Sequence, residues 1–331
     1  MSDEIFVAIA AYREPELRQT IESCIDTAAR PELLRFGVCL QYDLSGPPET
    51  QPDCLEGLDA HVRMLSHDWT ESKGGCWARH RTQGLYNGEA YTLQIDSHTR
   101  MAPNWDSDLI SMMHSFPSDK PLITGQLHLY DLVDGQPVFH NRVDSDVAVT
   151  VIKHWSEDGW IHHPSQAIPT ETAVPRPTRI MSGMFAFSLG AWNVEIRQDP
   201  EHLYCGEEFA LSIRSFTWGY DLFNPSHVVA WTRNHPEPNK KFISHHDKAE
   251  VNRRHGTAIK RLAVLLQGDP DRILAPYSVG PVRTVDEYSL WSGLDCAKRT
   301  FHEDAGLGRA PRLPAPVRAK LIPPAVPVSS Q

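Results

Sequence analysis

The stretch LQIDSHTRMAPNWD, residues 93–106, places a carboxylate and an imidazole two residues apart, directly after an apolar run. Asp96 offers a hard oxygen ligand and His98 a nitrogen ligand, a combination that suits Mn²⁺ well and Mg²⁺ less well. The oxygens of a diphosphate could complete such a shell. Short motifs also recur freely, so Asp96 could instead cap a turn while His98 lies on the surface. The spacing alone leaves both interpretations open.

The elements that must position these side chains follow from the pattern of the first 130 residues. Apolar runs typical of buried strands alternate with stretches in which apolar residues keep helical spacing. This alternation predicts an α/β fold, with a mostly parallel central sheet flanked by helices and a ligand site at the carboxyl ends of the strands. The Asp96–His98 motif stands at one such end. The predicted strands are residues 5–12, 35–43, 60–68, 90–96 and 121–131, and the predicted helices begin near Pro15 and cover residues 71–89 and 105–116.

The C-terminal half is less regular. Residues 134–179 are rich in Pro and His without a sustained period, which predicts a long loop or insertion on the acceptor side of the site. Helices are predicted from Gly206 to Trp218 and from Asp247 to Gln267. The predicted organisation is a main domain of residues 1–240, a helical extension of residues 241–305 and a Pro-rich flexible tail of residues 306–331.

The composition argues against several classes of partner. A formal net charge of -10 over 331 residues is unlike that of nucleic-acid-binding proteins. No apolar run approaches the roughly 18 residues of a membrane helix, and the apolar part of MSDEIFVAIAAYREPE is short enough to be a strand instead of a signal peptide. The six cysteines lack CxxC spacing, which predicts reduced thiols. We expect a cytoplasmic protein that binds neither nucleic acid nor membranes.

Four longer segments together resemble a known family. They are IFVAIAAYREPEL, GGCWARHRTQGLYNGEAYTLQIDSHTRMAPNWD, SGMFAFS and GEEFALSIRSFTWGYDLFNP, with a weaker match in DEYSLWSGLD. They resemble the GlcNAc-transferase family that includes the cytoplasmic enzyme attaching N-acetylglucosamine to a hydroxyproline of an SCF-complex subunit. The resemblance implies a GT-A type transferase with a helical C-terminal extension, which uses UDP-GlcNAc and a divalent metal and retains the anomeric configuration.

The resemblance also implies positions for the donor. A metal held by Asp96 and His98 would neutralise the leaving UDP. The end of the first strand would meet uracil and ribose, and Arg13 there would contact the donor or could simply pair with Glu14 or another neighbour. Arg79 in CWAR is favoured as a phosphate or ribose ligand, whereas Arg81 suits a solvated helix face equally well. The remaining donor-binding candidates are Ala10, Tyr12, Ser97, Ser182, Gly183, Met184, Arg233 and Lys240.

Two small-residue and acidic motifs complete the expected sugar pocket. The SGM turn, residues 182–184, would form a floor beneath the sugar, or it is merely a tight turn between strands. Glu207 and Glu208 follow Gly206, whose missing side chain permits close approach of backbone and ligand. The helix dipole accounts for one acid at such a position, and the resemblance to retaining polypeptide sugar transferases implies that either could bind donor hydroxyls. Asp221 is a weaker catalytic candidate, because its role could be limited to capping a turn.

The third metal ligand departs from the family pattern. Related enzymes place a histidine on the strand after the GEE helix, but here that stretch reads SHVVAWTRNH. His235 could serve after a shift in register, water could fill the position, or metal binding could be weak. These alternatives stay open.

Three classes of function remain. The preferred one is a retaining glycosyltransferase that moves N-acetylglucosamine or a related sugar from a UDP-sugar to a hydroxyl of a protein, peptide or small molecule. A non-catalytic nucleotide-sugar-binding protein of the same fold is the alternative. A metal-dependent hydrolase ranks last because no HxH or HExxH cluster is present. The acceptor is not predicted, although Trp160, His162 and His163 could line its groove or lie in solvent.

Overall fold

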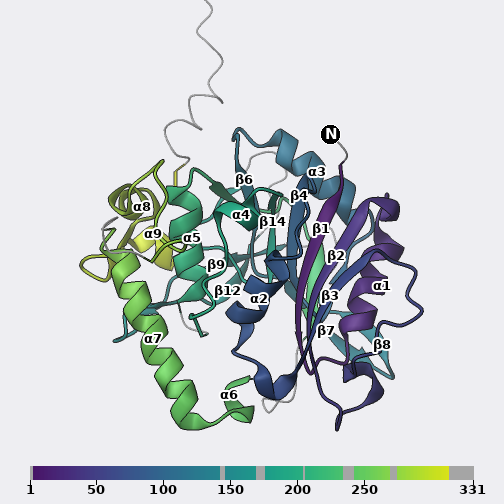
Figure 1. The fold of residues 1–331 in the computed structure, drawn as a ribbon. Coiled ribbons are helices and arrows are strands. Elements are labelled where there is room, and N and C mark those ends of the chain that lie inside the picture. The colour runs from purple at the N-terminus through teal and green to yellow at the C-terminus, as the bar shows by residue number, and fades with distance from the viewer. Residues whose placement is uncertain are drawn as a thin grey trace, which may run out of the picture.

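An eight-stranded mixed sheet forms the centre of the computed structural model, which describes residues 3–141, 146–168, 176–203, 206–233, 242–268 and 274–312 (Figure 1). The strand order is β13-β15-β6-β14-β4-β1-β2-β3. In that order the strands are Arg176–Pro177, Asp221–Asn224, Pro121–Thr124, Phe185–Leu189, Tyr91–Asp96, Ile5–Tyr12, Leu34–Tyr42 and Val62–Asp68.

Six strands that run in the same direction, β1, β2, β3, β4, β6 and β15, bring their carboxyl ends to one edge of this sheet. β1 pairs in parallel with β2 and β4, and β2 with β3, as the alternating pattern predicts. β14 then runs antiparallel to both β4 and β6, so the sheet is mixed at its centre. Because β14 is reversed, the turn before it lies at the same edge as the carboxyl end of β4.

Side chains of the strands alternate between two cores. Ile123, Phe187 and Phe223 pack into the core that holds the apolar sides of α1 (Leu17–Thr27) and α3 (Trp105–Ser115). Their neighbours Leu122, Ala186 and Leu222 pack into a second core with α5, Glu207–Thr217. This period of two is what a sheet buried on both faces requires. The remaining helices are α2 (Gly75–Gln83), α4 (Trp192–Glu195), α6 (Phe242–His245), α7 (Lys248–Leu266), α8 (Val285–Ser292) and α9 (Glu303–Gly306).

A second sheet corrects one expectation. The run predicted as one strand over residues 121–131 divides into β6 and β7 (His128–Val133), because the chain crosses to a four-stranded sheet of order β5-β16-β7-β8. Residues 134–179 were expected to be a long loop or insertion, and their described part holds short strands that pair with one another or with strands of the two larger sheets. These strands, with the rest of the second sheet, are β5 (Thr99–Met101), β16 (Ala230–Arg233), β8 (Gln136–Phe139), β9 (Val147–Thr150), β10 (His154–Trp155), β11 (Ile161–His162) and β12 (Ser165–Ile168).

The C-terminal part packs beside α5 and continues to Arg312. α8 begins with a capping box in which Thr284 and Glu287 satisfy each other's backbone amides. The hairpin β17–β18 (Leu294–Asp295 and Thr300–Phe301) and α9 follow. The first residues of the predicted tail, up to Arg312, pack on the body of the protein, and residues 313–331 lie outside the described part. No helix within the described ranges is long and apolar enough to cross a bilayer.

Candidate functional site

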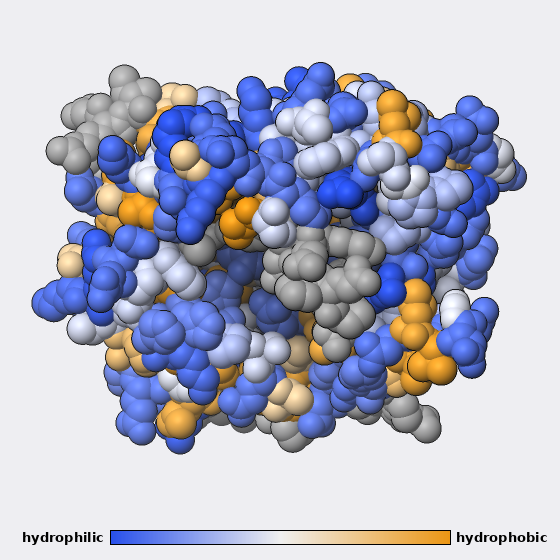
Figure 2. Space-filling view, turned by 90° about the horizontal axis from the view of Figure 1, so that it is seen from below, coloured by the Kyte–Doolittle hydropathy of each residue, from blue (hydrophilic) through white to orange (hydrophobic). Residues whose placement is uncertain are grey.

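The carboxyl edge of the main sheet gathers most of the predicted site residues. β1 is paired so that Ala10 lies opposite Asp96 of β4, and β4 ends at that aspartate. The amino end of α5 returns to the same edge, because α5 leads back to β15, which runs parallel to β6. These strands end at the bottom of Figure 1, and the view from below in Figure 2 shows a central hollow with largely hydrophilic walls.

The Asp96–His98 motif forms the turn between β4 and β5. His98 Nδ1 donates a 3.1 Å hydrogen bond to Glu14 Oε2, and His98 Nε2 lies 3.9 Å from Asp96 Oδ2. The turn is anchored because Thr20 Oγ1 donates to the carbonyl of Ser97 at 2.9 Å, so the buried Ser97 has a structural contact here. Burial favours the neutral imidazole, whereas the bond with Glu14 and the charge of Asp96 raise the pKa of His98.

Two ligands of one cation fit this geometry. With metal–ligand bonds of about 2.0–2.2 Å, an oxygen and a nitrogen 3.9 Å apart can share one ion. A histidine ligand commonly donates its other ring nitrogen to a carboxylate, as His98 does to Glu14. Within the described ranges, no group of three or more His, Cys, Asp or Glu side chains is arranged to hold a metal. His235 and Lys240, predicted as a ligand and a donor contact, lie outside those ranges.

Arg79 of α2 joins Asp96 to the SGM turn. Arg79 Nη2 donates to Asp96 Oδ1 at 3.0 Å, which leaves Oδ2 on the side of His98. A Cβ atom added to Gly183 would lie 2.7 Å from Arg79 Nη1. The absence of a side chain at Gly183 therefore provides the space in which the guanidinium reaches Asp96.

The two glutamates of the GEE motif have different surroundings. Glu208 Oε1 accepts the amide hydrogen of Gly183 at 2.5 Å, and Glu208 Oε2 lies 3.2 Å from His163 Nε2. Among the described residues, no hydrogen bond joins the Glu207 side chain to another side chain, and burial together with the charge of Glu208 raises the pKa of Glu207. Glu208 thus holds the SGM turn, and Glu207 does not.

A cluster of rings and charges covers the end of β1. Arg13, expected either to bind the donor or to pair with Glu14 or another neighbour, donates to Asp43 Oδ2 at 2.9 Å and lies over the ring of Trp69 at 4.6 Å. Tyr12 Oη lies 3.3 Å from His245 Nδ1 of α6. Although burial acts to raise it, hydrogen bonds from Ser45 and the charge of Arg13 hold the pKa of Asp43 below its usual value.

Sequence reasoning missed Asp43 and the α6 histidines. Asp43 is the last residue of the predicted second strand and follows directly on β2, so the same strand-end argument that selected Asp96 could have found it. His245 lies 233 residues beyond Tyr12 in the chain, and no local pattern connects them.

The remaining predicted residues lie in different parts of the molecule. Arg233 donates its backbone amide to the carbonyl of His98 at 3.0 Å, but its guanidinium lies 3.4 Å from Glu16. Met184 and Ser182 lie with Gly183 in the turn before β14.

Asp221, however, begins β15 opposite Pro121, at the far edge of the sheet. Its carboxylate pairs with Arg283 at 2.8 Å, so the structure does not bring Asp221 to this site.

A comparison with known protein families identifies the family of this chain. The family model described as Glycosyltransferase (GlcNAc) matches residues 4–59 and 49–298. No curated protein is similar enough in sequence to match.

Two solved structures are similar in fold. GalNAc-T7, crystallised with UDP, GalNAc and Mn²⁺, matches with a TM-score of 0.57 and 14% identity over 92% of this chain. This chain spans only about half of GalNAc-T7, 53% of its length. TarS 1–349 of S. aureus, in complex with UDP-GlcNAc, matches with a TM-score of 0.47 and 12% identity, over 81% of this chain and 67% of that one. The predicted GT-A type α/β fold is confirmed.

Proposed function

Since the chain belongs to the GlcNAc glycosyltransferase family, we propose that it transfers N-acetylglucosamine, or a related sugar, from a UDP-sugar to a hydroxyl group. The acceptor belongs to a protein, a peptide or a small molecule. The observation that carries the proposal is the meeting of Asp96, His98, Arg79 and the GEE motif at one edge of the sheet. The UDP, GalNAc and Mn²⁺ of the GalNAc-T7 structure support a donor of the same class.

A divalent cation, Mn²⁺ or Mg²⁺, would be held by Asp96 and His98. When bound, it supplies positive charge against the diphosphate of the leaving UDP. Glu14 fixes the ring of His98, and Arg79 fixes the carboxylate of Asp96. The side chains of Asp96 and His98 are therefore held in place before the cation and the UDP-sugar bind, which lowers the free-energy cost of assembling the site.

The chain's own groups account for sugar binding and for retention. The SGM turn, held by Glu208, supports the sugar from below, and Glu207 accepts a hydrogen bond from a sugar hydroxyl. In a retaining transfer the acceptor approaches the face that UDP leaves, and the departing phosphate oxygen takes the acceptor proton. The bond from C1 to the phosphate oxygen breaks as the new bond from C1 to the acceptor oxygen forms, so no separate carboxylate base is needed.

One observation favours the alternative of a non-catalytic nucleotide-sugar-binding protein. The described residues provide two metal ligands and no group of three. Water or His235 would have to complete the shell for turnover.

A cytoplasmic location is part of our proposal, supported by free thiols at Cys24, Cys39, Cys54, Cys76 and Cys296.

The test is turnover of labelled UDP-GlcNAc with Mn²⁺, with and without a panel of hydroxyl-bearing acceptors. We expect transfer that EDTA stops and that Asp96→Ala abolishes, while Asp26→Ala, which removes an exposed carboxylate of α1, leaves it unchanged. Binding of UDP-GlcNAc without release of UDP under any condition would favour the non-catalytic alternative. Full activity of Asp96→Ala would refute the metal assignment.

A further inference from the structure

Arg214 of α5 carries a buried positive charge that no described carboxylate neutralises. The residue is 2% exposed, and its guanidinium donates to the carbonyl of Arg197 at 2.6 Å and to that of Ser278 at 3.4 Å. Within the described ranges, Arg214 Nη2 has no hydrogen-bond partner. Asp199, the acid whose charge acts on Arg214, is paired with Arg261 at 2.6 Å. A guanidinium group buried in this way is costly unless an anion accompanies it.

His202 adds a second buried atom without a partner. The residue is 5% exposed, and its Nδ1 has no hydrogen-bond partner among the residues that the structure describes. Its Nε2 lies 3.9 Å from Asp199 Oδ2, too far for a hydrogen bond, so the ring hydrogen can be on Nδ1 and be donated from there. Burial lowers the pKa of His202 to about 4, and the charges of Arg261 and Arg214 lower it further. The ring is therefore neutral near pH 7 and provides a hydrogen without a charge.

Arg214 and His202 line one small cavity beside α5. Its volume is about 10 Å³, close to the space that one water molecule needs, so a single small ligand fits and phosphate or sulfate does not. Glu207 also lines the cavity, but burial and the charge of Glu208 raise the pKa of Glu207, which favours its uncharged form. The apolar lining comes from Ala210, Leu211, Leu265 and Leu274.

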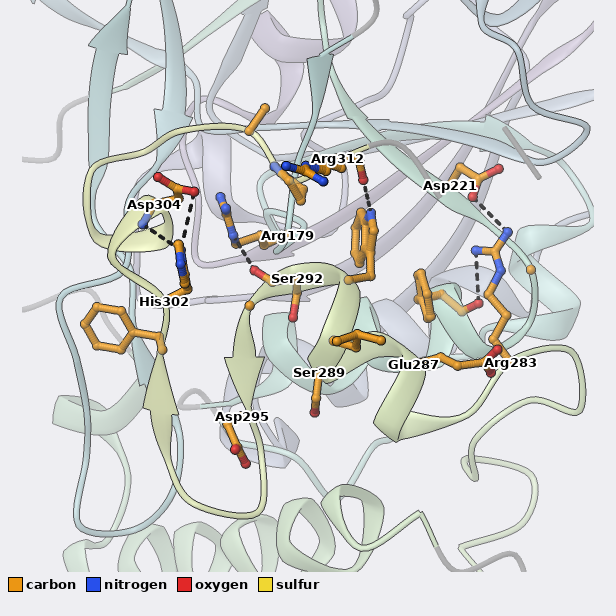
Figure 3. Close-up of a pocket in the computed structure, with 18 of the residues that line it drawn as sticks. Arg179, Asp221, Arg283, Glu287, Ser289, Ser292, Asp295, His302, Asp304 and Arg312 are labelled. Atoms are coloured by element: carbon orange, nitrogen blue, oxygen red, sulfur yellow. Dashed lines mark hydrogen bonds and ion pairs between the residues drawn. The ribbon is translucent and has the colours of Figure 1, made fainter. Parts of the chain in front are cut away.

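Arg179 shows what distinguishes the surroundings of Arg214. Arg179 is 8% exposed and donates to the carbonyls of Ser292 and Arg309. Burial lowers the pKa of both arginines to about 10. Arg179, however, lines a wide cleft of about 1240 Å³, in which water can hydrate its charge (Figure 3). The cavity at Arg214 has room for one ligand only, so hydration cannot replace a counter-ion there.

We propose that this cavity binds one small monovalent anion, chloride under physiological conditions, through Arg214 Nη2 and His202 Nδ1. The ion balances the charge of Arg214 and accepts a hydrogen bond from each side chain. The cavity is lined by α5, by Leu265 of α7 and by residues 274–277, so the ion also stabilises the packing of the C-terminal extension against α5. A water molecule is the alternative occupant, and it would leave the charge unbalanced.

Anomalous X-ray diffraction tests the site directly. Crystals are soaked in sodium bromide, because bromide replaces chloride and scatters anomalously. We expect an anomalous peak beside Arg214 Nη2 and His202 Nδ1. The peak should be absent in Ala210→Val, because the larger side chain fills the cavity without removing either donor.

Thermal unfolding tests the site in solution. Melting in sodium chloride is compared with melting in sodium gluconate at equal ionic strength, because gluconate is too large for the cavity. A tenfold excess of chloride over its dissociation constant should raise the melting temperature by about 2 °C. Arg214→Gln, which removes the charge, should lose this rise. Arg179→Gln, the matched control at the other buried arginine, should keep it.

Three results would overturn the proposal. The first is the absence of an anomalous peak from the wild-type cavity, which would leave water as its occupant. The second is an equal melting temperature in chloride and gluconate. The third is a chloride effect that persists in Ala210→Val, since the ion would then act elsewhere; this variant decides the matter even if Arg214→Gln does not fold. None of these readouts depends on transferase activity.

Discussion

Substituting Gly183 by alanine should disable the candidate site through Arg79 alone. The added Cβ would lie 2.7 Å from Arg79 Nη1, closer than real carbon–nitrogen contacts allow. The nearest atoms belong to the end of a flexible side chain, so the guanidinium should move and the backbone should stay. Reaching an ordinary contact of about 3.5 Å requires a shift of roughly 0.8 Å, enough to break the 3.0 Å bond to Asp96.

The magnitude follows from the bond that is lost. A hydrogen bond between charged groups contributes about 1.5–3 kcal/mol. Since Arg79 orients Asp96, its displacement should lower kcat/KM about 10-fold to 150-fold. The melting temperature should change little, because the Gly183 amide can still donate to Glu208.

Steady-state kinetics with UDP-GlcNAc, alongside thermal unfolding, provide the assay. Gly256→Ala is the control, because a Cβ at this position of α7 would have no neighbour within 4 Å. That substitution should leave kcat/KM unchanged and raise helix stability by up to about 1 kcal/mol.

A double-mutant cycle gives the refuting result. If Gly183→Ala acts only by displacing the guanidinium, it should cost almost nothing in an Arg79→Ala background. Additive losses, or wild-type kinetics for Gly183→Ala alone, would show that the glycine does not act through Arg79.

Three further predictions concern the glutamates and the product. Glu207→Ala should abolish transfer, because we propose that Glu207 binds a sugar hydroxyl, whereas Glu208→Ala should mainly lower the melting temperature, because Glu208 holds the SGM turn; equal, small effects on turnover would contradict this assignment. The raised pKa of Glu207 means that the folded chain keeps a proton that the unfolded chain releases, so stability should fall as pH rises above the ordinary range of glutamate. Glu207→Gln should remove that fall in urea titrations at pH 5 and pH 8, and an unchanged pH dependence would reject burial of the carboxyl. The charged or titratable groups that act on Glu207 are Glu208, Arg79, Asp96 and Cys76. Finally, an α-linked donor should give an α-linked product, which the anomeric proton coupling in its NMR spectrum reports; a β coupling would refute retention.

The elements with strong local periodicity could be predicted closely. β1 spans Ile5–Tyr12 as expected, and α5 spans Glu207–Thr217 within the predicted 206–218. In each of these segments the spacing of the apolar residues matches one kind of element, a strand or a helix, and not the other. The run at residues 121–131 was misread, because an apolar run does not show that the chain changes sheets within it.

Pairings over long sequence separation could not be predicted in the same way. For Arg13 the sequence left open a donor contact or a pair with Glu14 or another neighbour; its partner is Asp43, which parallel pairing of β1 and β2 brings alongside. Asp221 stands in a motif close to the GEE helix in sequence. The helix runs the length of the sheet, however, and delivers Asp221 to the opposite edge.

The reversed direction of β14 brings together the two ends of the segment that joins β6 to β14. β6 ends at Thr124, and the amide of Ser182 donates to Thr124 Oγ1 at 2.9 Å. Between these two points the chain forms β7 and β8 of the second sheet and adds β13 to the main sheet beside β15. The exposed turn at Asp134 and Gly135, between β7 and β8, lies outside these pairings. Residues could therefore be inserted there without altering strand register, at a closure cost that grows slowly with length.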